Sequence, residues 1–148
     1  MRDVCNNISI AKVFEQTAVY DAMIALSDSF FNQTVDKKTL SQKLFQHGTF
    51  KMAICDGVIA GFIGYYVNDK DSKTAFLSTI VISKGFHRRG IGTLLLRDCF
   101  SDCRSKGMAF CRLEVEKSNV SAINFYKRFG FEKEKESSEK SDYYICSL

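Results

Sequence analysis

One stretch constrains the fold of this 148-residue chain more than any other, and it reads His87-Arg88-Arg89-Gly90-Ile91-Gly92-Thr93-Leu94-Leu95. It follows an apolar, β-branched run over 75–82 that predicts a buried strand, and it opens a segment with helical periodicity. A basic glycine turn between a strand and a helix favours an anion, because backbone N–H groups and the positive end of the helix dipole point to one place. The sequence therefore predicts a strand–turn–helix unit that binds an anionic ligand.

Apolar spacing and capping residues predict the elements that follow this turn. The helix carries apolar residues at intervals of three and four over 91–103, and Lys106-Gly107 ends it with a basic turn and a glycine. Residues 111–116 alternate between apolar and charged, which is typical of a strand with one buried face. Ser118-Asn119 can then cap a further helix.

The rest of the chain adds strands on both sides of this unit. We expect strands over 8–13, 50–55, 58–67, 131–134 and 143–148, and helices over 14–31 and 40–45. Asp56-Gly57 predicts a hairpin turn between two of the strands. This order predicts an α/β fold with a mixed sheet, and because no repeat or linker divides the chain, a single domain over residues 1–148.

Charge and composition exclude several classes of protein. The chain is 45% hydrophobic and 26% charged, with a net charge of +4, which describes an ordinary globular domain that is mildly basic. Its basic residues do not interleave with exposed aromatics, so we expect no nucleic-acid partner. No apolar run approaches the ~20 residues that span a bilayer, and no N-terminal targeting pattern is present. We therefore expect no membrane partner and a cytoplasmic protein.

The cysteines are expected to be small buried hydrophobes rather than disulfides or metal ligands. Each lies among apolar neighbours, no CxxC motif occurs, and the two histidines are far apart and unaccompanied. The sequence thus predicts no metal site. The six are Cys5, Cys55, Cys99, Cys103, Cys111 and Cys146.

Two common nucleotide motifs do not match the glycine turn. The P-loop pattern GxxxxGK[ST] is absent, and the dinucleotide pattern GxGxxG fails because Leu95 occupies its third glycine position. What remains resembles the acetyl-CoA loop of the GCN5-related N-acetyltransferase (GNAT) family, which reads [Q/R]-x-x-G-x-[G/A]. Gly90-Ile91-Gly92 matches its last three positions, Arg88-Arg89 fills the variable ones, and His87 stands where Gln or Arg is usual.

A second motif strengthens this resemblance. Asn119 is followed seven residues later by Tyr126 and then by Gly130-Phe131, which is similar to the downstream signature of the same family. The two motifs together span residues 75–131, and the order of elements fits the family over the whole chain. The resemblance implies a GNAT fold, with a mixed, mostly antiparallel central sheet of about six or seven strands flanked by about four helices.

The resemblance also implies a binding site for acetyl-CoA as cosubstrate. The glycine loop would hold the pyrophosphate, and the backbone of the preceding strand would pair with the pantetheine arm. Asn119 would contact the cofactor near the next helix start, although its residue type also suits a helix N-cap. The implied cofactor-binding residues are Ile80, Val81, Ile82, His87, Arg88, Arg89, Gly90, Ile91, Gly92, Thr93 and Asn119.

Two catalytic residues carry over from the family. Tyr126 would be the general acid that protonates the departing thiolate, since a phenol with a pKa near 10 is protonated at neutral pH. Helical spacing also allows it to be a core aromatic. Glu114 matches the base of the ribosomal-protein N-terminal acetyltransferase branch. It could instead form a solvated face with Glu116, paired with Lys117 or Arg112. A strand N–H, such as that of Val81, would polarise the thioester oxygen.

The function implied is transfer of an acetyl group from acetyl-CoA to an amine of a small molecule or peptide, by direct attack in a ternary complex. The protein would be an N-acetyltransferase acting as a monomer or homodimer. O-acylation or transfer of another acyl group is the alternative among enzymes. The alternative that is not an enzyme is a catalytically degenerate domain that binds CoA as a sensor or scaffold. This alternative is kept because the strand over 75–82 lacks the carboxylate that many members of the family have there. The sequence does not identify the acceptor.

Overall fold

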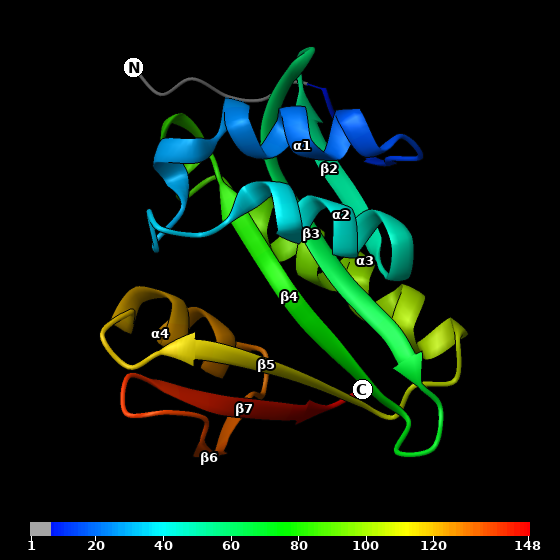
Figure 1. Cartoon of the computed structure of the whole chain (residues 1–148), viewed down its shortest axis with the longest axis vertical. Helices are drawn as coiled ribbons and strands as arrows, with labels where there is room; N and C mark the ends of the chain where they lie inside the picture. The colour runs from blue at the N-terminus through cyan, green and yellow to red at the C-terminus, as the bar shows by residue number, and fades with distance from the viewer. Residues whose placement is uncertain (1–6) are drawn as a thin grey trace.

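The computed structural model describes residues 7–148, whose helices and strands follow the predicted order (Figure 1). The elements are β1 (Ile8–Lys12), α1 (Gln16–Ala25), the 3-10 turn η1 (Ser27–Ser29), α2 (Lys37–His47), β2 (Thr49–Cys55), β3 (Val58–Asp69), β4 (Thr74–Ile82), the 3-10 turn η2 (Lys84–Phe86), α3 (Ile91–Ser105), β5 (Phe110–Glu116), α4 (Val120–Arg128), β6 (Glu132–Glu136) and β7 (Ser141–Ser147).

A single sheet organises the described part of the chain. Its seven strands lie in the order β1-β2-β3-β4-β5-β7-β6. Only β4 and β5 run parallel, because α3 connects them as a crossover, and all other neighbours are antiparallel. The predicted fold class, a mixed and mostly antiparallel sheet flanked by four helices, is confirmed.

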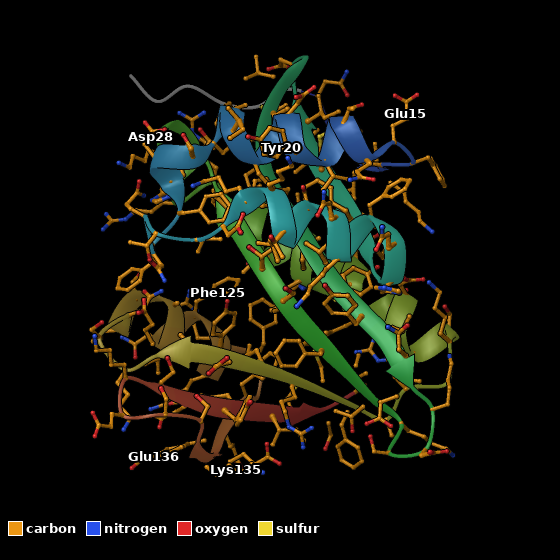
Figure 2. All side chains as sticks on the ribbon, in the orientation of Figure 1. Glu15, Tyr20, Asp28, Phe125, Lys135 and Glu136 are labelled. Atoms are coloured by element: carbon orange, nitrogen blue, oxygen red, sulfur yellow. The ribbon has the colours of Figure 1, made fainter. Side chains whose placement is uncertain are left out.

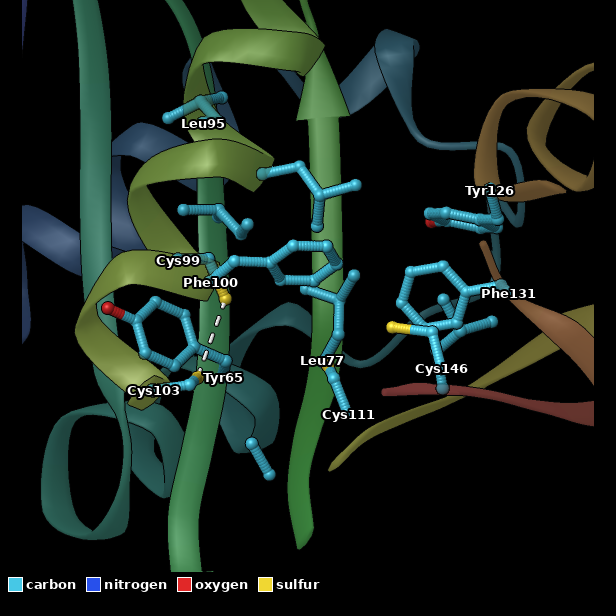
Figure 3. Close-up of a cluster of buried hydrophobic side chains, with 14 of the residues drawn as sticks. Tyr65, Leu77, Leu95, Cys99, Phe100, Cys103, Cys111, Tyr126, Phe131 and Cys146 are labelled. Atoms are coloured by element: carbon cyan, nitrogen blue, oxygen red, sulfur yellow. Dashed lines mark hydrogen bonds between the residues drawn. The ribbon is translucent and has the colours of Figure 1, made fainter. Parts of the chain in front are cut away.

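Helices cover both faces of this sheet and create two apolar cores. On one face, α1 and α2 pack against the sheet through side chains that include Val19, Leu44 and Phe62. On the other, α3 and α4 pack around Leu77 and Leu95 (Figure 3). Each core forms because apolar residues recur at helical spacing on one layer and at strand spacing on the other. No helix within residues 7–148 is long and apolar enough to cross a bilayer.

The two parallel strands separate part way along their length. They pair from Thr74 opposite Phe110 to Leu77 opposite Leu113, and no pairing is present beyond. On its other side β4 stays paired with β3 as far as Ile82, after a register shift beside Leu77. In Figure 1, β4 and β5 diverge from this point like the arms of a V. The opening lies at the carboxyl ends of the parallel strands, where open α/β sheets place their ligands.

The first two helices differ from their predicted bounds. The single helix expected over 14–31 ends at Ala25, and η1 follows it. Beyond η1, the side-chain amide of Gln33 donates to the carbonyl of Phe30 at 2.6 Å, a contact that periodicity cannot show. α2 is longer than expected, since Asp36 caps it by accepting from the Thr39 N–H at 3.1 Å.

The predicted turn and edge strand are both present. Asp56 and Gly57 have φ values of 49° and 82°, the left-handed conformations that a tight hairpin turn requires. β6 lies at the edge of the sheet and is exposed along its whole length, as expected for a run of alternating Glu and Lys. These charges discourage further strands from pairing with it.

The prediction for the cysteines is only partly correct. Cys99, Cys103, Cys111 and Cys146 are free and buried, as expected. Cys55 is also buried, but it is disulfide-bonded, so the expectation that no disulfide forms is wrong there. Such a bond depends on which segments lie side by side, and spacing along the chain does not give that. Cys5 lies outside the described residues.

Candidate active site

A cleft of about 1160 Å³ occupies the opening between β4 and β5. The end of β4, the glycine turn, α4 and the connection between α1 and α2 all contribute to its wall. Its charged lining is mostly basic, with Lys84, His87, Arg88 and Arg128, against the one carboxylate of Asp28 among the described lining residues. The cleft therefore favours an elongated anionic ligand.

The glycine turn exposes the first backbone N–H groups of α3. Gly90 is the N-cap, with φ of 77°, and Arg88 also has a left-handed φ of 63°. Gly90 accepts the first helical hydrogen bond, from the Leu94 N–H at 3.0 Å, and no side chain caps the helix. The N–H groups of the first turn, from Ile91 to Thr93, are thus available to an anion in the cleft.

Gly92 lies against α4, so its missing side chain matters for helix packing as well as for access of a ligand to the backbone. The sequence suggested that it lets a phosphate approach the backbone. A β-carbon added at Gly92 would lie 3.2 Å from the ring carbon Cζ of Phe125 and 3.8 Å from Ile82. The missing side chain therefore also lets α4 pack closely against the start of α3.

The three basic residues before Gly90 have different surroundings. Arg88 lines the cleft. The guanidinium of Arg89 instead lies 5.2 Å from the ring centre of Phe86, and Arg89 is not among the residues that line the cleft. His87 lines the cleft while its Nε2 lies 3.0 Å from the carbonyl oxygen of Ile82, so its ring ties the turn to the end of β4.

The backbone of β4 presents alternate residues to the opening. The Ser83 N–H donates to the Ala60 carbonyl at 2.8 Å. Alternate residues of a strand direct their N–H and C=O groups to the same side, so Val81, two residues before Ser83, also directs its backbone groups toward β3. The Ile82 carbonyl reaches His87 instead, so Ile80 and Ile82 direct theirs away from β3. A strand donor to a ligand in the cleft is therefore expected at Ile80 or Ile82 rather than at Val81.

Tyr126 lies where α4 meets the opening and is 9% exposed. Its ring lies 5.6 Å from those of both Phe125 and Phe131, and Figure 3 shows it projecting from α4 toward β4. Burial, and then the proximity of Cys111, raises the pKa of this phenol above its ordinary value. Since no described residue accepts its proton, the protonated hydroxyl can donate to a ligand.

Asn119 caps α4 and lines the cleft. Its Oδ1 accepts from the Ala122 N–H at 3.3 Å, so the capping role that its residue type suggested is present. It also belongs to the wall of the cleft, next to the first turn of α4. The structure is thus compatible with both roles considered for it.

Two substitutions at Asn119 should separate these roles. Asn119→Ala should lower the free energy of unfolding by about 1 kcal/mol, because the cap is lost. Asn119→Asp retains a capping oxygen and should keep wild-type stability, but its charge should weaken binding of an anionic ligand. Thermal unfolding and calorimetric titration with CoA measure the two effects. Unchanged CoA affinity in Asn119→Asp would leave Asn119 with the cap alone.

Glu114 lies outside the wall of the cleft. It is exposed on β5, on the face opposite to Leu113 and Val115, and opposite Tyr143 in register. The ion pairs considered for this face do not involve it. Within residues 7–148 Arg112 pairs with Glu134 at 2.7 Å and Lys117 with Glu136 at 3.2 Å, and no ion pair reaches Glu114 or Glu116. Its carboxylate is therefore available on the side of the sheet that carries α1 and α2.

Several residues of the cleft were missed by sequence reasoning. Phe125 and Arg128 contribute from α4, Lys84 and Phe86 from η2, and the α1–α2 connection adds a segment over 28–33. The α4 pair carried a signal, since an aromatic and a basic residue three positions apart share one helix face. The α1–α2 connection had no such sequence signal. It contacts η2 through a hydrogen bond between distant residues, in which the Lys84 N–H donates to Ser29 Oγ at 3.2 Å.

Comparison with known sequences finds one matching family. A sequence model of the Acetyltransferase (GNAT) family matches residues 18–131. The ribosomal protein bS18-alanine N-acetyltransferase of Salmonella typhimurium is 34% identical over 70 residues, which are 47% of this chain and 45% of that protein. N-alpha-acetyltransferase 50 of Danio rerio is 26% identical over 110 residues, which are 74% of this chain and 61% of that protein. The chain thus spans less than two thirds of either relative.

Solved structures share the whole described fold. The ribosomal-protein-S18-alanine N-acetyltransferase from Escherichia coli superposes with a TM-score of 0.78 at 22% identity, covering 96% of this chain and 93% of that one. The PaiA N-acetyltransferase from Thermoplasma acidophilum, solved in complex with coenzyme A, gives 0.76 at 17% identity, covering 96% and 99%. At this level of identity the likeness concerns the fold.

Proposed function

The chain belongs to the GNAT acetyltransferase family, and we propose that it transfers an acetyl group from acetyl-CoA to an amine of a small molecule or peptide. Membership of the family confirms the resemblance that the two motifs carry. One observation supports the proposal most strongly: the cleft joins an uncapped helix start, an unpaired strand segment and a buried tyrosine in a single space. These three groups match the phosphates, the amides and the sulfur of acetyl-CoA in turn.

Acetyl-CoA fits the cleft by charge and by hydrogen bonding. The free N–H groups at the start of α3 and the side chain of Arg88 would bind the pyrophosphate. The backbone groups of Ile80 and Ile82, which β5 does not pair, would bind the amides of the pantetheine arm as a neighbouring strand would. The volume of about 1160 Å³ is ample for an elongated ligand of this kind.

The reaction would proceed by direct attack of the amine on the thioester. A backbone N–H of Ile80 or Ile82 would polarise the carbonyl oxygen. As the new C–N bond forms and the C–S bond breaks, Tyr126 would donate its proton to the departing sulfur. Glu114 would accept a proton from the nitrogen, through a water molecule, because it is exposed and lies outside the wall of the cleft.

The acceptor amine determines how much help a base must give. An amine attacks only when it is neutral, and a lysine-like amine with a pKa of about 10.4 needs ~4–5 kcal/mol to reach that state near pH 7. An α-amine, with a pKa of about 7.7–8.0, needs only ~1 kcal/mol. A base acting through water suits the second class better. We therefore place peptide α-amines, which the names of two relatives suggest, first among the acceptors to be tested.

Replacing Glu114 by Gln should lower kcat/KM for the amine about tenfold near pH 7. This is less than the loss of about a hundredfold or more that is usual for a general base, because the group is exposed and would act through water. The loss should shrink as the pH rises and the amine becomes neutral without help. Initial rates of thiol release between pH 6.5 and 9 measure this change. Glu116→Gln, on the same face of β5, is the control and should leave the profile unaltered. Equal losses in both variants would exclude Glu114 as the base.

Thiol release from acetyl-CoA with a panel of amines tests the proposed function itself. The panel should contain peptides with a free N-terminus, lysine side-chain analogues, diamines and aminoglycosides, and other acyl-CoAs should be compared on the best acceptor. We expect turnover with at least one amine and none with the matching alcohol. Saturable CoA binding without turnover on any amine would support the alternative, a domain that binds CoA as a sensor or scaffold.

A further inference from the structure

Arg128 is one of the basic residues of the cleft that the proposed reaction leaves without a role. Its guanidinium carbon lies 5.7 Å from the ring centre of Phe125, so the side chain is held over that ring. The same ring lies 3.2 Å from the β-carbon position of Gly92, at the start of α3. One aromatic ring therefore separates Arg128 from the N–H groups proposed to bind the pyrophosphate. Both Phe125 and Arg128 line the cleft.

The ring of Phe125 gives this arginine a fixed support. It packs at 5.1 Å against Phe129 and at 5.6 Å against Tyr126, so neighbours on α4 fix its orientation. Figure 2 shows Phe125 on the α4 side of the opening between β4 and β5. Among the described residues no carboxylate pairs with Arg128, so its donors stay available to a ligand.

We propose that Arg128 binds the 3′-phosphate of coenzyme A and lets the protein distinguish CoA from 3′-dephospho-CoA. The proposal rests on the proposed function, since it takes CoA as the ligand of the cleft. CoA carries a phosphate monoester on its ribose, a short distance beyond the pyrophosphate. Such a group has a charge of about −1.5 to −2 at pH 7, and a guanidinium can bind it through two parallel hydrogen bonds.

The other basic groups near the cleft are less suited to this phosphate. His87 is bonded to the Ile82 carbonyl, and Arg89 is stacked on Phe86 outside the cleft. Lys84 lies beside Ser29, on the side of the α1–α2 connection. Arg88 belongs to the glycine turn itself and is assigned to the pyrophosphate. Arg128 is therefore the remaining candidate for the 3′-phosphate. The ring of Phe125 lies between it and the start of α3.

The competing explanation for Arg128 is a purely structural one. It lies in the last turn of α4, where a positive charge stabilises the helix dipole. That role would affect folding but could not tell two ligands apart that differ by one phosphate. The ratio of the affinities for CoA and 3′-dephospho-CoA is therefore the decisive measurement.

Isothermal titration of the intact protein with CoA and with 3′-dephospho-CoA tests the proposal. The wild type should bind CoA about tenfold more tightly, which corresponds to about 1.4 kcal/mol and is modest because the site is exposed. Arg128→Gln should bring the ratio close to one while keeping the affinity for 3′-dephospho-CoA, and Arg128→Lys should restore part of it. Arg104→Gln is the matched control, because Arg104 also stacks on a phenylalanine, at 6.0 Å from the Phe100 ring, but does not line the cleft.

The outcomes separate this proposal from the function on which it rests. A tenfold ratio that persists in Arg128→Gln would overturn the assignment, and loss of the ratio in Lys84→Gln instead would move it to Lys84. Equal weakening of both ligands in Arg128→Gln would place the arginine at the pyrophosphate. If the wild type bound neither ligand, the proposed use of acetyl-CoA would fail first. Thermal unfolding of each variant verifies that the fold is retained.

Discussion

Replacing Tyr126 by phenylalanine should lower kcat for acetyl transfer about a hundredfold or more, which is the range expected when a general acid is removed. The substitution deletes one oxygen from a ring that is already held between Phe125 and Phe131, so packing should hardly change. The dissociation constant for CoA should stay within about twofold of the wild-type value, because the hydroxyl contributes to bond cleavage rather than to phosphate binding. Steady-state kinetics and calorimetric titration measure the two quantities.

A control and a pH profile make this test specific. Tyr144 is buried in the same core and does not line the cleft, so Tyr144→Phe should retain turnover. Burial raises the pKa of Tyr126, so its protonated form, which is the form proposed to act as the acid, persists as the pH rises past 9. Loss of activity on the alkaline side between pH 7 and 9 should therefore not arise from this residue. Unchanged turnover in Tyr126→Phe would remove it as the acid.

Replacing Gly92 by glutamate should weaken CoA binding about a hundredfold or more. The new carboxylate would enter the place where the first turn of α3 is proposed to hold a pyrophosphate. Two like charges about 4 Å apart near a protein surface repel each other by about 4 kcal/mol, of which solvent screens a part. In addition, the β-carbon would lie 3.2 Å from the ring carbon Cζ of Phe125, so that ring must shift by a few tenths of an ångström. Titration calorimetry with CoA gives the affinity directly.

Two further variants separate charge from packing at Gly92. Gly92→Ala adds only the β-carbon and should show a smaller loss of affinity together with a lower thermal midpoint. Gly85→Glu introduces the same charge in η2, where an added β-carbon meets nothing within 4 Å, and should weaken binding much less. If Gly92→Glu bound CoA as tightly as the wild type, the phosphate site would have to lie elsewhere in the cleft.

Sequence reasoning succeeded where local pattern determines local structure. The helix from Ile91 to Ser105 and the turn at Asp56-Gly57 follow from apolar spacing and from the need for a positive φ, both of which are written in neighbouring residues. The fold class followed from the order of such elements. The family motifs predicted an anion site at the end of β4, where the structure has a cleft, and the roles of its residues remain predictions.

It failed where a side chain depends on distant partners. Arg89 was grouped with its neighbours by sequence, but its guanidinium lies over the ring of Phe86 and does not line the cleft. The helix expected to reach residue 31 ends at Ala25. In the segment that follows, Gln33 donates to the Phe30 carbonyl, and Ser29 accepts from the Lys84 N–H, 55 residues away. The sequence indicated the face of β5 on which Glu114 lies, but it could not show that this side chain lies outside the wall of the cleft. None of these relations has a signature in periodicity.

The parting of β4 and β5 also bears on aggregation. From residue 78 to 82, β4 has backbone groups on the side away from β3 that no neighbouring strand pairs, although the Ile82 carbonyl contacts His87. Such an edge normally recruits strands from other molecules. Here the edge is recessed, with α1 and α2 on one face of the sheet and α3 and α4 on the other. We therefore expect this edge to accept an unbranched chain bearing amides and not a second protein strand with side chains.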